Sequence, residues 1–414
     1  MNKPKIRFEG YTEAWEQRKL GEMGQTYTGL SGKTKDDFGH GQARFVTYMN
    51  VFSNPISNPE MTEPIEIDPK QNEVEVGDVF FTTSSETPEE VGMSSILLEK
   101  RGKTYLNSFC FGFRPSEKID SYYLAYMLRS ESTRAKIILL AQGISRYNIS
   151  KNKVMEIAVS LPSLDEQKLI GQYFSQLDHL ITLHQRKCEQ TKKLKKYMLQ
   201  KMFPQNGELY PEIRFEGFTE AWEQRKLGEI CERVTRKNKN NESDLPLTIA
   251  SQFGLIDQRD FFNKVVAAKD MSNYYLLKKG EFAYNKSYSN GFDYGSIKRL
   301  NAYEQGCLST LYICFGITSD EVESDYLECF FDTLKWYGDV SMICAEGARN
   351  HGLLNVDTKG FFDEVTIDLP KSLEEQKKIS AYLNALDNLV TLHQHKCEEL
   401  QNIKKFMLQN MFTK

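Results

Sequence analysis

Two long stretches of the chain carry apolar residues in steps of three and four, the spacing of one face of an α-helix. They occupy residues 161–203 and 369–412, with acidic residues in the first turn of each. Neither Gly nor Pro interrupts the first stretch after Gly171. The pattern predicts two helices of about 38 residues, each about 57 Å long at 1.5 Å per residue. Because each apolar stripe needs a partner and each helix leads out of a different half of the chain, we expect the two helices to pair antiparallel.

Short runs of alternating β-forming residues, bounded by Gly, Ser and Pro, precede each long stretch. In the first half they are EVGDVFFTTSS (75–85) and YLNSFCFGFRP (105–115), followed by a helical pattern at 120–140. The second half repeats this order at 278–296, 306–317 and 324–338. The two blocks are therefore predicted to share one mixed α and β fold while differing in surface.

The chain contains an internal sequence repeat. IRFEGYTEAWEQRKLGE (6–22) recurs at 213–229 with one change, Tyr11 to Phe218, and the two helical stretches also match. We predict an α+β fold with an internal pseudo-twofold repeat, in which two similar mixed α/β domains are separated by the antiparallel helix pair. The predicted parts are a shared N-terminal segment (1–22), a first variable block (23–160), a central long helix (161–203), a linker with the second shared segment (204–229), a second variable block (230–368) and a C-terminal long helix (369–414).

Composition narrows the class of protein. The 414 residues are 40% hydrophobic and 27% charged, without an apolar leader or a long apolar run, so we expect a cytoplasmic globular protein with no membrane contact. The eight cysteines form no C-x-x-C pair, which favours reduced packing thiols over zinc ligands or disulfides. A net charge of −4 argues mildly against nucleic-acid binding, but local basic patches and partner subunits can supply positive charge.

Catalytic motifs are weak. GLSGKTK (29–35) ends like a phosphate-binding loop, but position 27, where that motif has Gly, is Tyr. Lys33 and Lys35 are better interpreted as phosphate contacts on a DNA-facing loop. The chain has only SNPIS and SNPE (53–60) where an adenine methyltransferase would carry an N-P-P-(F/Y/W)-like site. His184 and His393, which are repeat equivalents, are expected on the buried helix stripe.

The doubled EAWEQRKLGE, the doubled L-P-x-L-x-EQ-x-x-I that begins each long helix, with one residue inserted in the second copy, and YNKSYSNG (284–291) resemble the specificity subunit of type I restriction-modification systems. The resemblance covers essentially the whole chain. It implies a non-catalytic subunit that binds double-stranded DNA, with each variable block as a target-recognition domain for one half of a split site. It further implies that the helices fix the gap and, with the shared segments, hold two adenine-N6 methyltransferase subunits, which restriction/translocase subunits join. S-adenosylmethionine, ATP and Mg²⁺ would belong to those partners, and this chain would bind no cofactor.

Aligned polar loops are the candidate base-reading sites, since their side chains suit base edges and phosphates. The first pair of loops comprises Thr83, Ser84, Ser85 and Glu86 in one block and Lys286, Ser287, Tyr288, Ser289 and Asn290 in the other. The second pair comprises Arg146 and Tyr147, and Arg349, Asn350 and His351. The densest basic loop adds Arg236, Lys237 and Lys239. The alternative for each residue is a polar turn or a solvated surface.

The identical segments should face identical partners, whereas blocks that diverge should face different DNA half-sites. We expect Trp15 and Trp222 to pack inside, and the charged faces to dock a methyltransferase, through Arg18, Lys19, Arg225 and Lys226. Helices of about 57 Å exceed one duplex turn of about 34–36 Å, so both blocks could meet one duplex. The competing hypothesis is a scaffold whose two blocks bind proteins. A stand-alone nuclease is disfavoured because the sequence shows no convincing acidic metal cluster.

Overall fold

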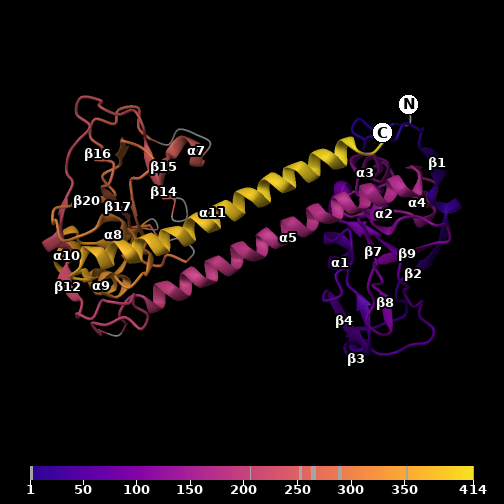
Figure 1. The fold of residues 1–414 in the computed structure, drawn as a ribbon, viewed down its shortest axis with the longest axis horizontal. Helices are drawn as coiled ribbons and strands as arrows, with labels where there is room; N and C mark the ends of the chain where they lie inside the picture. Colours follow the sequence, from indigo (N-terminus) through magenta and orange to yellow (C-terminus); the bar gives the residue numbers. More distant parts are fainter. Residues whose placement is uncertain are drawn as a thin grey trace. The chain divides into compact units, whose positions relative to one another are not determined.

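The computed structural model describes residues 3–205, 207–250, 254–262, 267–287, 291–350 and 353–413, with backbone alone at 345–350 and 353 (Figure 1). The chain divides into two compact units. Unit 1 comprises Met1–Arg186 and His393–Lys414, and unit 2 comprises Lys187–Leu392. Each unit thus holds one variable block and a part of both long helices, so the division runs through the helices.

A four-stranded antiparallel sheet lies at the centre of unit 1, in the order β2 (Gly24–Thr28), β9 (Cys110–Pro115), β5 (Val79–Thr82) and β7 (Ser94–Ile96). A second sheet orders β4 (Thr62–Ile65), β3 (Phe38–Val46) and β8 (Thr104–Leu106), in which β3 and β8 are parallel. Unit 1 also contains α1 (Tyr48–Ser53), β6 (Ser84–Ser85), β10 (Tyr147–Asn148) and α4 (Lys151–Met155), with single 3-10 turns at Leu20–Glu22, Lys35–Asp37 and Pro88–Glu90. Strands are confirmed within both predicted runs, 75–85 and 105–115, although a turn divides the second run into the end of β8 and β9.

The helix predicted over 120–140 is two helices, α2 (Ser121–Leu128) and α3 (Glu131–Ile138). The prediction was wrong in continuity because Ser130 caps α3, where its hydroxyl oxygen accepts from the amide of Thr133 at 3.4 Å. The apolar spacing persists across this break, so periodicity alone does not reveal it.

Unit 2 repeats the central sheet with β13 (Cys231–Arg233), β20 (Ile313–Ile317), β17 (Phe282–Asn285) and β18 (Ser296–Arg299). Around it lie the pairs β14 (Leu247–Ala250) with β15 (Gly254–Asp257), β16 (Tyr275–Lys278) with β19 (Gln305–Leu308), and β21 (Cys344–Asn350) with β22 (Leu353–Val356). The helices are α6 (Leu227–Ile230), α7 (Gln258–Phe262), α8 (Ser324–Asp332), α9 (Tyr337–Ile343) and α10 (Thr358–Glu364). Because its sheet order matches that of unit 1, the predicted common fold is confirmed.

The shared segments occupy equivalent places in the two units. Strand β1 (Glu16–Lys19) pairs with β11 (Ala158–Leu161), and β12 (Glu223–Lys226) pairs with β23 (Thr366–Leu369), both antiparallel. Just before each strand, Trp15 and Trp222 are 2% exposed, as predicted. The Ile6 amide donates to the Asn410 carbonyl at 3.0 Å, and the Ile213 amide donates to the Lys201 carbonyl at 2.9 Å.

Helices α5 (Leu164–Lys201) and α11 (Leu373–Asn410) each have 38 residues, which confirms the two long helices. In unit 1, Asp178 contacts Lys404, and His184 Nδ1 lies 3.0 Å from His393 Nδ1. In unit 2, Cys188 Sγ donates to the Val390 carbonyl at 4.0 Å and Lys195 donates to Asp387 at 2.8 Å. Positions rise along one helix as they fall along the other, so the pairing is antiparallel within each unit. In the described part of the chain, no helix is both long and apolar enough to cross a membrane.

Candidate nucleic-acid interface

The two candidate loops of the first block come together at the carboxyl end of β5. Strands β6 and β10 pair so that Ser85 lies opposite Tyr147 and Ser84 opposite Asn148. The Ile149 amide donates to the Thr83 carbonyl at 3.0 Å. Residues separated by more than sixty positions along the chain therefore form one polar surface.

The members of this surface differ in exposure. Glu86 and Arg146 are exposed, and Thr83 and Tyr147 are half-buried. Ser84 and Ser85 are only 6% and 7% exposed, and the Ser85 hydroxyl donates to Glu90 at 3.2 Å. Their side chains support the loop in this conformation, whereas Thr83, Glu86 and Arg146 are open to a ligand.

Phe109, which the sequence interpretation did not single out, lies in the middle of this surface. Its side chain is 54% exposed, and the Arg146 guanidinium lies 6.0 Å from the ring centroid. Its carbonyl accepts from the Thr83 amide and the Thr83 hydroxyl, both at 2.9 Å. Residues 105–115 read as one strand in sequence, but residues 107–109 form a turn between β8 and β9. The Asn-Ser pair at 107–108 was the available turn signal.

The second block brings its candidates together in the same way. Lys286 and Ser287 follow β17 and are half-buried, and the Lys286 carbonyl accepts from the Leu354 amide at 2.9 Å. Burial lowers the pKa of Lys286, and the nearby Arg233 charge lowers it further. Arg349 and Asn350 lie in β21, where only their backbone is described, opposite Leu354 and Leu353. Tyr288, Ser289, Asn290 and His351 lie outside the described residues.

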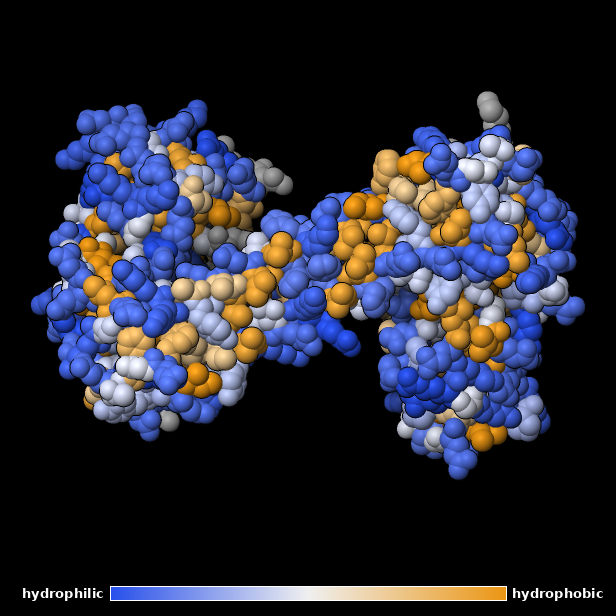
Figure 2. All heavy atoms as spheres, viewed as in Figure 1, coloured by the Kyte–Doolittle hydropathy of each residue, from blue (hydrophilic) through white to orange (hydrophobic). Residues whose placement is uncertain are grey.

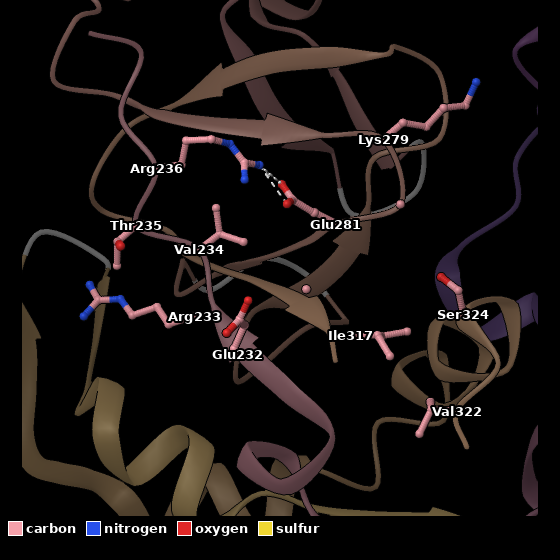
Figure 3. Close-up of a pocket in the computed structure, with 12 residues that line it drawn as sticks. Glu232, Arg233, Val234, Thr235, Arg236, Lys279, Glu281, Ile317, Val322 and Ser324 are labelled. Carbon is pink, nitrogen blue, oxygen red and sulfur yellow. Dashed lines mark hydrogen bonds and ion pairs between the residues drawn. The ribbon is translucent and has the colours of Figure 1, made fainter. Parts of the chain in front are cut away.

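The basic loop of the second block borders a cavity of about 510 Å³ at the edge of the sheet (Figure 3). Arg236 Nη2 lies 2.7 Å from both Glu281 oxygens, while Lys279 points away from this pair (Figure 3). The Lys237 ammonium lies 3.8 Å from the Tyr275 ring centroid and donates to the Asn273 carbonyl. Lys239 is exposed. Two of the three predicted cations are therefore engaged inside their own block.

The lysines of the 29–35 loop divide in a similar way. Lys33 lies 2.9 Å from Asp68 and its side chain is 13% exposed. Lys35 is exposed. Of the two, Lys35 is the one available to a phosphate without breaking an ion pair.

The charged residues of the shared segments form ion pairs within their own units. Arg18 lies 3.5 Å from Glu117, and Lys19 lies 2.7 Å from Glu156. Their equivalents are paired as well, Arg225 with Glu229 and Glu321, and Lys226 with Glu364. The shared segments therefore carry ion-paired side chains near the surface of both units.

Apolar side chains also remain exposed on the long helices, where orange atoms interrupt the polar surface (Figure 2). They include two pairs of repeat equivalents, Leu180 with Leu389 and Tyr197 with Phe406. The others are Leu169, Leu194, Leu373 and Leu392. Exposed apolar positions that recur in both copies are typical of protein-binding surfaces.

The cysteines pack mostly in the interior. All eight lie among the described residues and outside any disulfide, and seven of them are buried, in agreement with packing thiols. Burial raises the pKa of Cys231 and of Cys314 to about 12. Within the ranges that the structure describes, no group of three or more His, Cys, Asp or Glu residues could hold a metal ion.

Comparison with known proteins gives a consistent family. The model of the type I restriction modification DNA specificity domain matches residues 12–193 and again residues 219–402. Two curated proteins of Methanocaldococcus jannaschii are similar. A putative type I restriction enzyme MjaX specificity subunit is 23% identical over 97% of this chain and 93% of its own length. The type I restriction enzyme MjaVIII specificity subunit is 26% identical over 77% and 75%.

Solved structures show the same fold. The S subunit of a type I restriction-modification system from M. genitalium aligns with a TM-score of 0.62 at 16% identity, over 100% of this chain and 99% of that one. A chain from a structure describing complex assembly and conformational transition of the type I R-M system aligns with a TM-score of 0.51 at 17% identity, over 95% and 96%.

Proposed function

The chain belongs to the type I restriction-modification DNA specificity family, and from that membership we propose that it selects the DNA sequence on which such a complex acts. Each variable block reads one half of a bipartite site in double-stranded DNA. The helices set the spacing and, with the shared segments, dock two adenine-N6 methyltransferase subunits, which restriction/translocase subunits join.

The observation that carries this proposal is the contrast between what the two units keep and what they change. The bidentate pair of Arg7 with Glu166 recurs as Arg214 with Glu375, at 2.7–2.9 Å in both units. The loops at the ends of β5 and β17, by contrast, carry Thr-Ser-Ser in one unit and Lys-Ser in the other. Two identical protein partners and two different DNA half-sites account for both facts.

DNA reading is supported by the surface at the ends of β5 and β17. Side chains of Thr83 and Glu86, and Lys286 in the other block, are donors and acceptors suited to base edges. Arg146 is exposed and, since its guanidinium presents a planar fork, suits either guanine or a phosphate. Specificity then resides in the blocks and positioning in the rest of the surface.

Methyltransferase docking is supported by the duplicated surface. The ion-paired Arg18 and Lys19 recur as Arg225 and Lys226, and the long helices expose apolar residues in equivalent places, Leu180 with Leu389 and Tyr197 with Phe406. Protein interfaces combine apolar area with a polar and charged rim. S-adenosylmethionine, ATP and Mg²⁺ are assigned to the partner subunits, and this chain takes no catalytic step.

The test is to co-express the chain with the methyltransferase encoded beside it and map N6-methyladenine on DNA by long-read sequencing. We expect a split motif with a methylated adenine in each half. Replacing residues 230–368 with the corresponding block of another family member should change one half of the motif and leave the other. A soluble, assembled complex that methylates nothing would instead favour a scaffold that binds proteins through both blocks.

A further inference from the structure

One turn is built alike in the two variable blocks, although their loop sequences differ. In unit 1 the Asn107 side chain accepts from the Phe109 amide at 2.8 Å, and the Asn107 carbonyl accepts from the Cys110 amide at 3.1 Å. In unit 2 the Ser309 hydroxyl accepts from the Leu311 amide at 3.2 Å, and the Ser309 carbonyl accepts from Tyr312 at 3.2 Å. The two turns are therefore equivalent in position and in hydrogen bonding.

Both turns present a large apolar side chain to solvent. Phe109 is 54% exposed and Leu311 is 57% exposed. Isolated exposed apolar residues are common on protein surfaces and need no explanation. Here the same turn position is apolar and exposed in both blocks, which a random surface does not predict.

The two turns also occupy equivalent places beside the candidate loops. In unit 1, Thr83 is bonded to the Phe109 carbonyl. In unit 2, the last pair of β17 with β20 is Tyr284 with Ile313, so Lys286 and Leu311 each lie two residues beyond that pair on neighbouring strands. Thr83 and Lys286 are both candidate DNA contacts, and each apolar tip therefore belongs to the same end of the sheet as a candidate contact.

We propose that Phe109 and Leu311 are apolar wedges that contact the bases of DNA, one in each half of the recognised site. This inference rests on the proposed function and names the residues through which it acts. Positive charge near the tips favours DNA as the occupant, since the Arg146 guanidinium lies 6.0 Å from the Phe109 ring centroid, and Lys286 lies two residues beyond the same strand pair as Leu311. Apolar side chains that enter a groove partly unstack a base step, while cations beside them hold the phosphates.

The experiment uses the full chain in complex with the methyltransferase and a duplex carrying the mapped motif. Fluorescent 2-aminopurine is placed in one half-site or the other. Phe109→Ala should weaken binding to the motif about tenfold, within the range expected for loss of one stacked base. It should also abolish the rise in 2-aminopurine fluorescence on binding, in one half-site alone. Leu311→Ala should do the same in the other half, and Phe109→Trp should retain binding.

The matched control is Val76→Ala. Val76 is 62% exposed and precedes β5, whereas Phe109 lies at the other end of that strand, so the control removes exposed apolar surface from the same sheet. Equal affinity and equal fluorescence for Phe109→Ala and wild type would overturn the wedge while leaving the proposed function intact. Loss of the methyltransferase from the Phe109→Ala complex would overturn it as well, in favour of a protein contact. A wild-type complex that binds no motif would overturn both proposals.

Discussion

At the scale of single residues, the two units differ in the hydrogen bonding of the repeated tryptophan. Trp222 donates its indole N–H to Glu375 at 3.3 Å, whereas the Trp15 N–H is buried without a partner among the described residues. Both rings pack edge-on against a tyrosine, Tyr123 in unit 1 and Tyr326 in unit 2. The identical sequence thus carries a satisfied donor in one unit and an unsatisfied donor in the other.

This difference predicts unequal costs for the same substitution. Trp222→Phe should destabilise unit 2 by about 1–3 kcal/mol more than Trp15→Phe destabilises unit 1, because a hydrogen bond to a charged group is lost only at Trp222. Amide hydrogen exchange resolves the two units, since each opens with its own free energy. Equal losses of protection in the two variants would contradict the prediction.

Thiol reactivity tests the assignment of the cysteines. Cys344 is the half-buried one, whereas burial raises the pKa of Cys231 and Cys314 to about 12 and so removes their thiolates near neutral pH. We expect an alkylating reagent at pH 8 to modify Cys344 first in the native protein, and the others only after unfolding. Cys344→Ser should abolish the fast phase when labelling is followed by mass spectrometry.

Residue roles could be predicted from the sequence only where the repeat or the residue type constrained them. The burial of Trp15 and Trp222 could be predicted because the segment is repeated almost unchanged and its tryptophan is the large apolar residue that can anchor it to the core. Burial of Ser84 and Ser85 did not follow, because it depends on β6 pairing with a loop some sixty residues away. The exposure of Phe109 could not be predicted, because an apolar residue inside the strand-like run 105–115 is expected to belong to a strand.

At the scale of elements, an interhelical lysine recurs but its surroundings do not. Lys404 pairs with Asp178 in unit 1, and Lys195 pairs with Asp387 in unit 2. In unit 2 the half-buried Asp332 at the end of α8 also binds Lys195 and Lys298, at 2.9 and 2.8 Å. Burial opposes ionisation of Asp332, but the two lysines outweigh it and lower its pKa.

A lowered carboxyl pKa makes stability depend on acid. The contribution of Asp332 is complete above the unfolded Asp pKa of about 3.9, and it is lost as pH falls through the lower folded value. Asp332→Asn should destabilise unit 2 by about 2 kcal/mol at pH 7, because it leaves the half-buried ammonium groups of Lys195 and Lys298 less compensated. It should also weaken the loss of stability in acid. Hydrogen exchange between pH 3 and 7 measures both. Asp387→Asn should destabilise unit 2 clearly less, because the Asp387 side chain is 48% exposed.

Element prediction succeeded where a period persisted and failed where a cap intervened. The helix predicted within 161–203 is observed at Leu164–Lys201 because its apolar spacing extends over ten turns. The helix predicted over 120–140 breaks at Ser130, where a single hydroxyl competes with helix continuation. The spacing of apolar residues does not predict such a break.

At the scale of the whole molecule, duplication sets the expected stoichiometry. The charge-reversed pair Arg18→Glu and Lys19→Glu alters one shared segment and leaves Arg225 and Lys226 intact. We expect the complex to bind one methyltransferase instead of two, as native mass spectrometry would show.

The fold should survive that reversal, since Trp15 remains buried and both changed side chains are at the surface. Circular dichroism verifies this, and Lys193→Glu, an exposed helix position, is the charge-matched control. Two methyltransferases bound to the reversed variant would sink the docking assignment.

The doubled architecture could be predicted from the sequence, and the division into units could not. Repeats at 6–22 and 213–229 indicated two halves, joined by the predicted linker within 204–229. The compact units instead exchange parts of both helices, because antiparallel pairing brings the end of α11 back to the first block. Only contacts between distant residues determine such an exchange.

The joint between helix end and shared segment has one further consequence. In unit 2 the bond from Ile213 to Lys201 joins residues twelve positions apart, whereas in unit 1 the same bond joins Ile6 to Asn410, which are far apart in the sequence. A short covalent connector is therefore not needed for this bond to form. A protease that nicks the chain between residues 204 and 212 should leave two fragments that copurify and refold together, so the molecule is expected to tolerate being supplied as two separate polypeptides.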